Sequence, residues 1–432
     1  MLRIAARLAL PLLFASPLIA GAQTAPSFRN YLPPGSVAQS AGEPTLDVTK
    51  TNQIVYQASL ETYKVSFNDA AATSTWTDVS SLYTSMVTLD PILTGDPETG
   101  RIFVSQLLTA TSLMAYSDNE GQSWTPTQGA GIASGIDHQT VGAGPYPKTG
   151  LGSTLARPTL NYPNAVYYCS QTLVDGFCSR SDNGGLSFGP SIPTFKLGCS
   201  GGLHGHVKVA PDGTVYLPHK NCGGKPGFAV SSDAGLTWTV RSVPTGTAGG
   251  SADPSIGIGK DGTAYLSWVD GNGRPKVAST KDKGVSWTAA FDLGGPVGVQ
   301  NAVFPAAVAG DGDRAAVAFH GTTTGGNFQG LNFPGLWHLY VATTYDGGAT
   351  WTVSNVTPGD PTQGAGGICT GGTTCGSNRN LLDFMDLVVD HSGRIHVGYA
   401  DGCIGACVGG GANSFAARAS IARQVGGTLL YR

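Results

Sequence analysis

The 432-residue sequence is poor in charge and contains no pattern that is typical of helices. Asp, Glu, Lys and Arg together make up 12% of the residues, about half of the usual ~25%. No long segment after residue 30 shows helical periodicity. These two absences exclude a helical bundle. Disorder is excluded as well, because Trp, Tyr and Phe are plentiful and β-branched residues recur throughout.

The sequence also lacks a basic tract and a cofactor-binding motif. Without Arg3 and Arg7, which lie in a predicted leader, 23 basic residues face 28 acidic ones, a net charge of −5. We therefore expect neither nucleic acid nor an anionic membrane as a partner, and we expect no organic cofactor. A monomer is the expected state.

No CxxC pair occurs among the eight cysteines, an even count. Nearest neighbours in sequence pair as Cys169 with Cys178, Cys199 with Cys222, Cys369 with Cys375 and Cys403 with Cys407. This spacing predicts four local disulfides in an exported protein. Metal binding by thiolates is the lesser alternative.

The only long apolar run lies at the N-terminus and predicts a secretory signal peptide. Arg3 and Arg7 precede an apolar run over 8–19, and Ala20-Gly21-Ala22 fits a small-x-small cleavage site. The run is too short to span a bilayer, and no other segment could span one. We expect cleavage near Ala22 and secretion of residues 23–432, a single domain, to the periplasm or the medium.

Glycine is what the sequence has in excess, with 63 residues, about twice average usage. Against this background one pattern, [Ser/Thr]-x-[Asp/Asn]-x-Gly-x-[Ser/Thr]-[Trp/Phe], occurs five times. Its copies occupy 117–124, 181–188, 231–238, 280–287 and 344–351. Recurrence at such a spacing indicates a repeat architecture.

Each copy predicts a tight turn between two antiparallel strands. The Asp or Asn side chain can accept hydrogen bonds from backbone N–H groups one and two residues on. The Gly permits a positive φ without steric cost, and the terminal Trp or Phe packs inward.

The pattern resembles the Asp-box, or BNR repeat, of the sialidase-like β-propeller superfamily. This resemblance implies an all-β fold made of four-stranded antiparallel blades. It also implies that the boxes lie at blade edges, away from the catalytic centre, so their residues are expected to be structural.

A second motif precedes each box and sets the blade count. It consists of a leading residue, often followed by Pro, then an alternating apolar strand, a turn and a second strand. Its seven copies begin at Glu43, Asp90, Arg157, His204, Asp253, Phe304 and Phe384. Seven copies predict seven blades, whereas sialidase catalytic domains have six; six blades and an additional hairpin are the alternative.

The leading residues of this motif form the candidate site. In a propeller the first strand of each blade lines the central channel, so these residues should stand near its mouth. The residue two positions on shares their orientation, which adds His206 and Asp386. Asp90, Asp253 and Asp386 are the candidate catalytic residues, and Glu43, Arg157, His204 and His206 are candidate binding residues. The alternative is a channel whose polar residues only hold water.

Two insertions add further candidates. Residues 128–156 contain Asp137 and His138, and residues 320–338 contain Trp337, whose surroundings of Gly and aromatic residues could stack on a sugar ring; a surface flap is the alternative. His204 and His206 with Asp137 or His138 could hold a divalent metal. Glu43, Asp90 and Asp253 could instead bind Ca²⁺.

The resemblance implies, for a sialidase, three Arg that clamp a carboxylate and a Tyr nucleophile activated by Glu. This chain departs from that pattern, because its four Glu residues all lie before residue 121. Tyr399, followed by Asp401, is the remaining candidate nucleophile pair. We predict a secreted propeller that recognises a glycan or glycoconjugate at the channel mouth, as a binding protein or a glycoside hydrolase. The alternative is a non-catalytic structural or protein-binding propeller.

Overall fold

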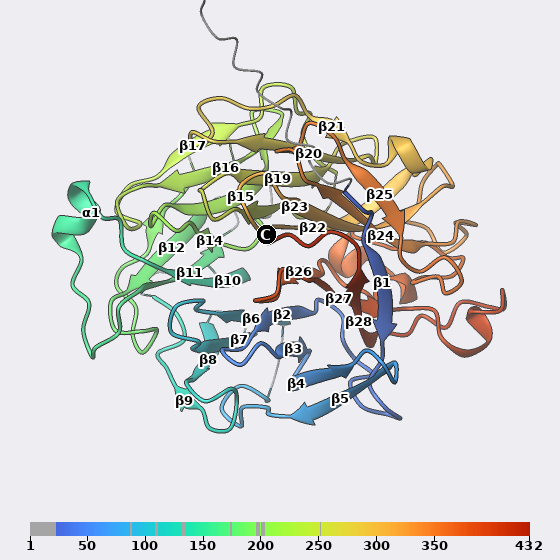
Figure 1. Cartoon of the computed structure of the whole chain (residues 1–432), viewed down its shortest axis with the longest axis horizontal. Coiled ribbons are helices and arrows are strands. Elements are labelled where there is room, and N and C mark those ends of the chain that lie inside the picture. The colour runs from blue at the N-terminus through green and yellow to red at the C-terminus, as the bar shows by residue number, and fades with distance from the viewer. Residues whose placement is uncertain are drawn as a thin grey trace, which may run out of the picture.

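The computed structural model describes residues 23–86, 89–108, 111–131, 135, 137–172, 175–195, 199, 204–250 and 252–432. Within these residues, seven four-stranded antiparallel sheets are arranged as blades around a central axis (Figure 1). The seven-bladed propeller predicted from the sequence is confirmed, and the six-bladed alternative is wrong. The predicted signal peptide lies outside the described residues.

Six blades run outward from the axis in chain order. Blade one contains β2 (Thr45–Val48), β3 (Ile54–Ala58), β4 (Glu61–Asn68) and β5 (Thr73–Asp78). Blade two contains β6 (Leu89–Gly95), β7 (Ile102–Leu108), β8 (Thr111–Ser117) and β9 (Thr125–Pro126). Blade three contains β10 (Asp137–Gly144), β11 (Ala165–Gln171), β12 (Gly176–Ser181) and β13 (Ile192–Pro193).

The next three blades repeat this order. Blade four contains β14 (Lys208–Val209), β15 (Val215–Cys222), β16 (Lys225–Ser231) and β17 (Thr239–Ser242). Blade five contains β18 (Ser255–Ile258), β19 (Ala264–Val269), β20 (Pro275–Thr280) and β21 (Phe291–Asp292). Blade six contains β22 (Asn301–Ala309), β23 (Ala315–Thr322), β24 (His338–Thr344) and β25 (Thr352–Asn355).

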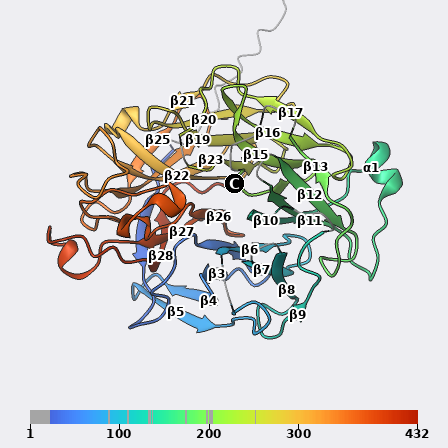
Figure 2. The same ribbon diagram turned by 180° about the vertical axis from the view of Figure 1, so that it is seen from behind.

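Blade seven closes the ring with strands from both ends of the described chain. It contains β26 (Asp386–Val389), β27 (Ile395–Asp401), β28 (Arg418–Gly426) and, outermost, β1 (Ser27–Tyr31). Helix is confined, in the described part of the chain, to α1 (Gly150–Leu155) and four 3₁₀ turns (Gly295–Val297, Gly372–Thr374, Ser377–Arg379 and Gly405–Cys407). None of these helices is long and apolar enough to cross a membrane. The view from behind shows the same closed ring (Figure 2).

The innermost strands define the two faces of the molecule. All seven run in the same sense, since each blade begins anew at the axis after its fourth strand. We call the face on which they begin the mouth face and the other the far face. The aromatic residues of the second and third strands fill the spaces between blades: Phe228 of blade four packs on Trp287 of blade five at 5.1 Å between ring centroids, and the Tyr56 hydroxyl donates to the Tyr399 carbonyl. Trp287, the terminal aromatic residue of the fourth repeated turn, thus packs inward as predicted.

The five repeated turns share one hydrogen-bond pattern. In the first, Ser117 Oγ donates to Asn119 Oδ1 and accepts from Gly121 N–H, and Ser123 N–H donates to Asn119 Oδ1 at 2.9 Å. The Asp or Asn side chain therefore reaches four residues on, which corrects the expected one and two. The glycine has the predicted positive φ, 84° at Gly121. These turns join third and fourth strands on the far face, where Lys283 in the fourth copy pairs with Asp212 of a β14–β15 turn at 3.0 Å.

All four predicted disulfides are present. They join Cys169 to Cys178, Cys199 to Cys222, Cys369 to Cys375 and Cys403 to Cys407. The last two hold loops that lie before and within blade seven, in segments with little regular structure. Such disulfides are consistent with an oxidising, extracellular environment.

The sequence motif misplaced the first strand of blade three. Arg157 to Leu160 does not form a strand; it follows α1 in the loop between β10 and β11, and Leu160 and Asn161 both have φ of 56°. The innermost strand is β10, inside the segment expected to be an insertion. The error arose because β10 lacks the leading Pro, whereas the loop contains one by coincidence.

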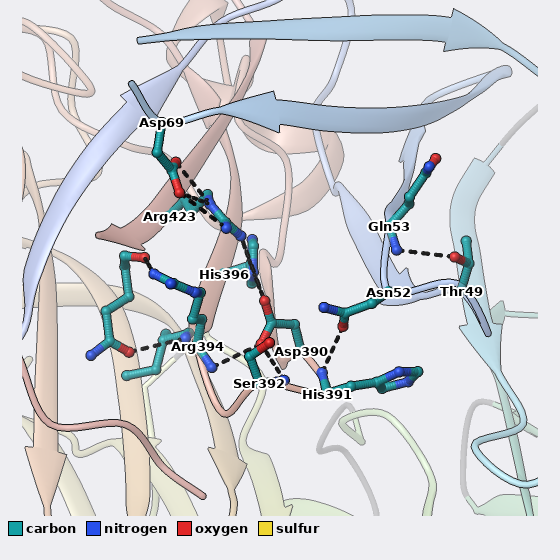
Figure 3. Close-up of polar contacts among 12 residues, drawn as sticks. Thr49, Asn52, Gln53, Asp69, Asp390, His391, Ser392, Arg394, His396 and Arg423 are labelled. Carbon is teal, nitrogen blue, oxygen red and sulfur yellow. Dashed lines mark hydrogen bonds and ion pairs between the residues drawn. The ribbon is translucent and has the colours of Figure 1, made fainter. Parts of the chain in front are cut away.

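A polar cluster locks blade seven onto blade one at the point of ring closure (Figure 3). Arg423 on β28 donates to the carboxylate of Asp69, which lies in the β4–β5 turn of blade one. The Tyr31 hydroxyl on β1 donates to the same carboxylate at 2.7 Å. Behind Arg423, its Nη1 lies 3.0 Å from His396 Nε2 and 3.5 Å from Asp390 Oδ2, both buried.

We predict that Asp69→Ala lowers the free energy of unfolding by about 1–2 kcal/mol, since hydrogen bonds to charged groups contribute about 1.5–3 kcal/mol and Asp69 is partly exposed. Hydrogen bonds from Arg423 and Tyr31 outweigh the effect of burial and lower the pKa of Asp69. Its contribution is therefore present above the usual carboxyl pKa and is lost as the pH falls through the lowered value. Denaturant unfolding at two pH values measures both effects. Asp118→Ala, at an exposed pair with Arg101, is the control, and an equal loss there would contradict the prediction.

Candidate functional site

The start of each innermost strand brings one side chain to the mouth of the channel. Hydrogen bonds between blades fix the equivalence: the hydroxyls of Thr45, Thr140 and Ser255 accept from the N–H groups of Leu93, Val207 and Ala307 on the next blade. On each innermost strand, the residue two positions before the one aligned in this way lies at the mouth of the channel. These residues are Glu43, Asp90, His138, His204, Asp253, Phe304 and Phe384. We call these seven residues the mouth ring. Six are those that the sequence motif gave, and His138 takes the place of Arg157.

Backbone geometry at the mouth ring is unusual. Four of its residues have positive φ although none is glycine: Glu43 (56°), Asp90 (52°), His138 (56°) and Phe304 (55°). At the last three the pairing of first and second strands shifts register, as in a β-bulge. A non-glycine residue in this region costs about 1–3 kcal/mol, and bulges of this kind redirect a side chain. The ring thus holds its side chains in place at a cost in backbone energy.

His138 and Asp253 form an ion pair across blade four. His138 Nε2 lies 2.6 Å from Asp253 Oδ2, and both side chains are 7% exposed. Burial disfavours the imidazolium, but the negative charge of Asp253, followed by that of Asp90, outweighs it and raises the pKa of His138 to about 10. The contact has ion-pair distance without hydrogen-bond alignment, so His138 Nε2 and both Asp253 oxygens have no hydrogen-bond partner among the described residues.

Glu43 and Asp90 are two carboxyl groups that influence each other. Burial, followed by the charges of Asp90 and Asp383, raises the pKa of Glu43 well above its usual range. Burial also raises the pKa of Asp90, while the charge of His138 acts in the opposite direction. Asp90 accepts a hydrogen bond from His138 N–H at 3.1 Å. Glu43 is therefore the group that holds a proton, and Asp90, less buried, is the group that ionises first.

The two histidines of the HxH motif are neutral. Burial and the charge of His138 lower the pKa of His204 to about 3, and burial lowers that of His206 well below its usual range. His204 Nδ1 lies 3.0 Å from the Gly205 carbonyl, which can only accept, so Nδ1 carries the hydrogen and Nε2 the lone pair. The His204 and His138 rings are 5.2 Å apart, and His206 packs on Phe384 at 4.7 Å.

Several buried acceptors at the mouth have no donor among the described residues. They are His204 Nε2, Asp253 Oδ1 and Gln139 Oε1; Asp253 Oδ2 lies 2.6 Å from His138 Nε2, and the amide of Gln139 donates from Nε2 to the Asp90 carbonyl. Buried polar groups are almost always satisfied, and unsatisfied ones point to a bound water, ion or ligand. A group of unpaired acceptors around one paired cation is suited to a guest that supplies hydrogen-bond donors.

Two predicted site residues, Arg157 and Trp337, lie away from this cluster. Arg157 is exposed and donates to the Thr154 and Ala156 carbonyls. Trp337 is fully buried against Phe328 and Phe333, so the predicted stacking of Trp337 on a sugar is wrong, because its own loop encloses the ring.

Asp386 lies two positions beyond the mouth ring. Its carboxylate accepts from Leu46 N–H at 3.3 Å and from Leu387 N–H at 2.8 Å, so it ties blade seven to blade one. Asp137 is exposed beside Asp90, whose pKa it helps to raise.

The sequence motif missed a basic residue near the ring. Arg379 donates to both oxygens of Asp383 at 2.6 Å, and the nearby charges of Glu43 and Asp90 contribute to its raised pKa. Its loop also supplies the Leu381 carbonyl that accepts from Glu43 N–H. The i,i+4 spacing of Arg379 and Asp383 was readable, but it occurs once and outside the repeat.

No group of three or more His, Cys, Asp or Glu residues within the described ranges has an arrangement that could hold a metal ion. The divalent metal predicted from His204, His206 and the acidic residues stays a prediction.

Comparison with known proteins identifies the fold. No protein-family model and no curated protein matches the sequence. A GH74 enzyme from Niastella koreensis superposes with a TM-score of 0.51 at 16% identity, covering 87% of this chain and 53% of the enzyme, so the chain spans about half of its length. A protein of unknown function from Dyadobacter fermentans (TM-score 0.47, 14% identity, 92% and 99% coverage) and a Hadza microbial sialidase (0.40, 15%, 89% and 65%) also match. At these identities the likeness concerns the propeller fold alone.

We predict that Glu43→Gln stabilises the protein at pH 7. A carboxyl whose pKa is raised by folding contributes stability below its unfolded pKa, and this contribution is lost as the pH rises through the folded value. A neutral amide avoids that loss, so the melting temperature of the variant should exceed that of wild type at pH 7 and match it near pH 4. The control Glu61→Gln removes an exposed carboxyl and should shift both melting temperatures equally. A variant that melts lower at pH 7 would overturn the assigned protonation.

Proposed function

We propose that the mouth ring binds the terminal sugar of a glycan and that the protein is an exported glycoside hydrolase acting through Glu43 and Asp90. The observation that carries this proposal is the set of buried acceptors at His204 Nε2, Asp253 Oδ1 and Gln139 Oε1, for which the described part of the chain supplies no donor. Sugar hydroxyls are donors, several are attached to each ring, and they carry no net charge. Binding sites of this kind combine an enclosed shape with a few well-placed polar groups.

The electrostatics of the two carboxyl groups support a hydrolytic role. Glycosidases pair a protonated carboxylic acid with an ionised carboxylate. Glu43, whose pKa burial raises, is suited to be the acid, and Asp90, next to the cationic His138, is suited to be the carboxylate. Two groups whose surroundings separate their protonation states are typical of such an acid–base pair.

The proposed reaction is hydrolysis of a glycosidic bond. Glu43 gives its proton to the glycosidic oxygen as the bond between that oxygen and the anomeric carbon breaks. In one route Asp90 takes a proton from the water whose oxygen bonds to the anomeric carbon, and solvent returns a proton to Glu43. In the other route Asp90 first bonds to the anomeric carbon, and water then displaces Asp90 and gives its proton to the Glu43 carboxylate. Asp253 holds His138 in place through Oδ2, and its Oδ1 accepts a hydrogen bond from a hydroxyl group of the sugar. In this proposal neither Asp386 nor Arg157 takes part.

Further support comes from the setting of the site. The repeated turns resemble Asp-boxes, which implies kinship with sialidase-like propellers, and the four disulfides suit an exported protein. Removal of a leader near Ala22 would release the propeller with the mouth ring intact, because that ring begins at Glu43.

We predict that protein comprising residues 23–432 releases sugar from at least one member of a panel of sialylated and neutral glycans. Asp90→Asn and Glu43→Gln should each lower kcat by about 10²–10⁴-fold, as is usual for a lost acid or base. Glu61→Gln and Arg157→Ala should retain wild-type rates. Loss of activity in Arg157→Ala with normal folding would contradict the assignment.

A chelator arm tests the predicted metal in the same assay, since loss of activity that added Ca²⁺ or Zn²⁺ restores would require one. Release by none of the preparations, with binding retained and lowered by Asp90→Asn, would make the protein a glycan-binding propeller without catalysis. Absence of both release and binding would overturn the proposed function and favour the structural or protein-binding alternative.

A further inference from the structure

A short segment of the mouth face exposes large apolar side chains while burying its small polar ones. Between β5 and β6, Leu82 is 89% exposed, Tyr83 50% and Met86 69%, whereas Ser81 and Thr84 are fully buried. Folding normally produces the opposite order, and contiguous exposed apolar groups mark interaction sites. We call these three side chains the apolar platform.

The platform is presented on a fixed turn. Thr84 N–H and Ser85 N–H both donate to the Ser81 carbonyl, and the Ser85 hydroxyl donates to the Leu60 carbonyl at 2.8 Å. Leu60 lies in the β3–β4 turn, on the mouth face. These hydrogen bonds therefore hold the backbone, and exposure of the apolar side chains is a consequence of a defined fold of the segment.

The chain itself limits the distance from the platform to the mouth ring. Met86 precedes Asp90 by four residues, and an extended chain advances at most about 3.6 Å per residue. The Cα atoms of Met86 and Asp90 are thus separated by no more than about 14 Å. A glycan polymer whose end is bound in the mouth ring is long enough to span this distance and contact the apolar platform.

The chemistry of the segment narrows the partner. Residues 79–86 contain no charged residue, and Asp78 and Glu61 beside them are acidic, which disfavours an anionic membrane. Three side chains are few against the 20–30 residues that each partner usually contributes to a stable protein interface. A half-exposed Tyr ring in a segment that also exposes Leu82 and Met86 instead matches the apolar C–H face of a sugar ring.

We propose that Leu82, Tyr83 and Met86 bind the sugar units of a glycan chain that lie beyond the unit held in the mouth ring. This inference rests on the proposed function and extends it, because it makes a polymer or long oligosaccharide the preferred substrate. A protein that acted on free disaccharides alone would gain nothing from the platform.

The test compares long and short probes on variants of the platform. The probes are xyloglucan, arabinan and a sialylated mucin, each beside a disaccharide that ends in the same sugar. Tyr83→Ala and the double variant Leu82→Ser/Met86→Ser should weaken binding of the long probe about tenfold, equivalent to about 1.4 kcal/mol, and leave the short probe unchanged. Val285→Ser is the matched control, since Val285 is also 69% exposed but lies on the far face.

The possible results distinguish the proposed role of the apolar platform from that of the mouth ring and from other binding partners. Unchanged affinity for long probes, or equal losses for long and short ones, would overturn the platform while leaving the mouth ring in place. No binding of any probe by the wild-type protein would overturn both the proposed function and the platform. Sedimentation with neutral lipid vesicles, or self-association, that the platform variants abolish and Val285→Ser retains would assign these side chains to a membrane or to a second copy, and would equally overturn the proposal.

Discussion

Closure of the ring is the constraint on which the rest of the molecule depends. Each blade buries its aromatic faces only against its two neighbours, so an open ring would leave blades one and seven exposed on one side. β1 closes it by adding the outermost strand to a blade whose other strands lie some 360–400 residues later in the sequence, a separation set by the element bounds. The clamp of Asp69 on Tyr31 and Arg423 then joins that blade to blade one. The entropy of so long a closure is recovered only when all seven blades are formed.

The closed ring also explains where the charged residues gather. Seven strands that begin at one axis bring seven side chains together, although they come from positions as far apart as 43 and 384. A chain that is otherwise short of charge places Glu43, Asp90, His138 and Asp253 at that meeting point. In the charge-poor interior each ionised group depends on the others. The charges of Asp253 and Asp90 raise the pKa of His138, and the charge of His138 in turn favours the ionised form of Asp90. The pair and its neighbours therefore act as one unit.

Much of this arrangement could be predicted from the sequence. Repetition gave the blade count, the turns and six members of the mouth ring, because a repeat fixes the position of each residue relative to an axis. The prediction of the first strand of blade three was wrong because β10 lacks the leading Pro, whereas the loop at Arg157 contains a similar motif. Burial of a loop residue could not be predicted from the repeat. Trp337 lies in a segment rich in Gly and aromatic residues, which suggested an exposed ligand-binding ring, but Phe328 and Phe333 of the same segment enclose it. Arg379 was not predicted because it lies in a loop outside the repeat, where periodicity does not place residues relative to the axis.

The energetics separate the parts of the molecule that serve the fold from those that serve a guest. At the far face the Asp or Asn side chain of each of the five repeated turns is bonded within its own turn, and Asp386 in the channel accepts from two backbone N–H groups. At the mouth, positive φ angles, raised carboxyl pKa values and acceptors without donors occur together. Each of these features lowers stability, and none of them improves packing between blades. Unpaired buried polar atoms also occur elsewhere among the described residues, at Tyr167, Trp268 and Thr343 for example, so it is their coincidence with strained backbone and raised carboxyl pKa values that sets the mouth apart.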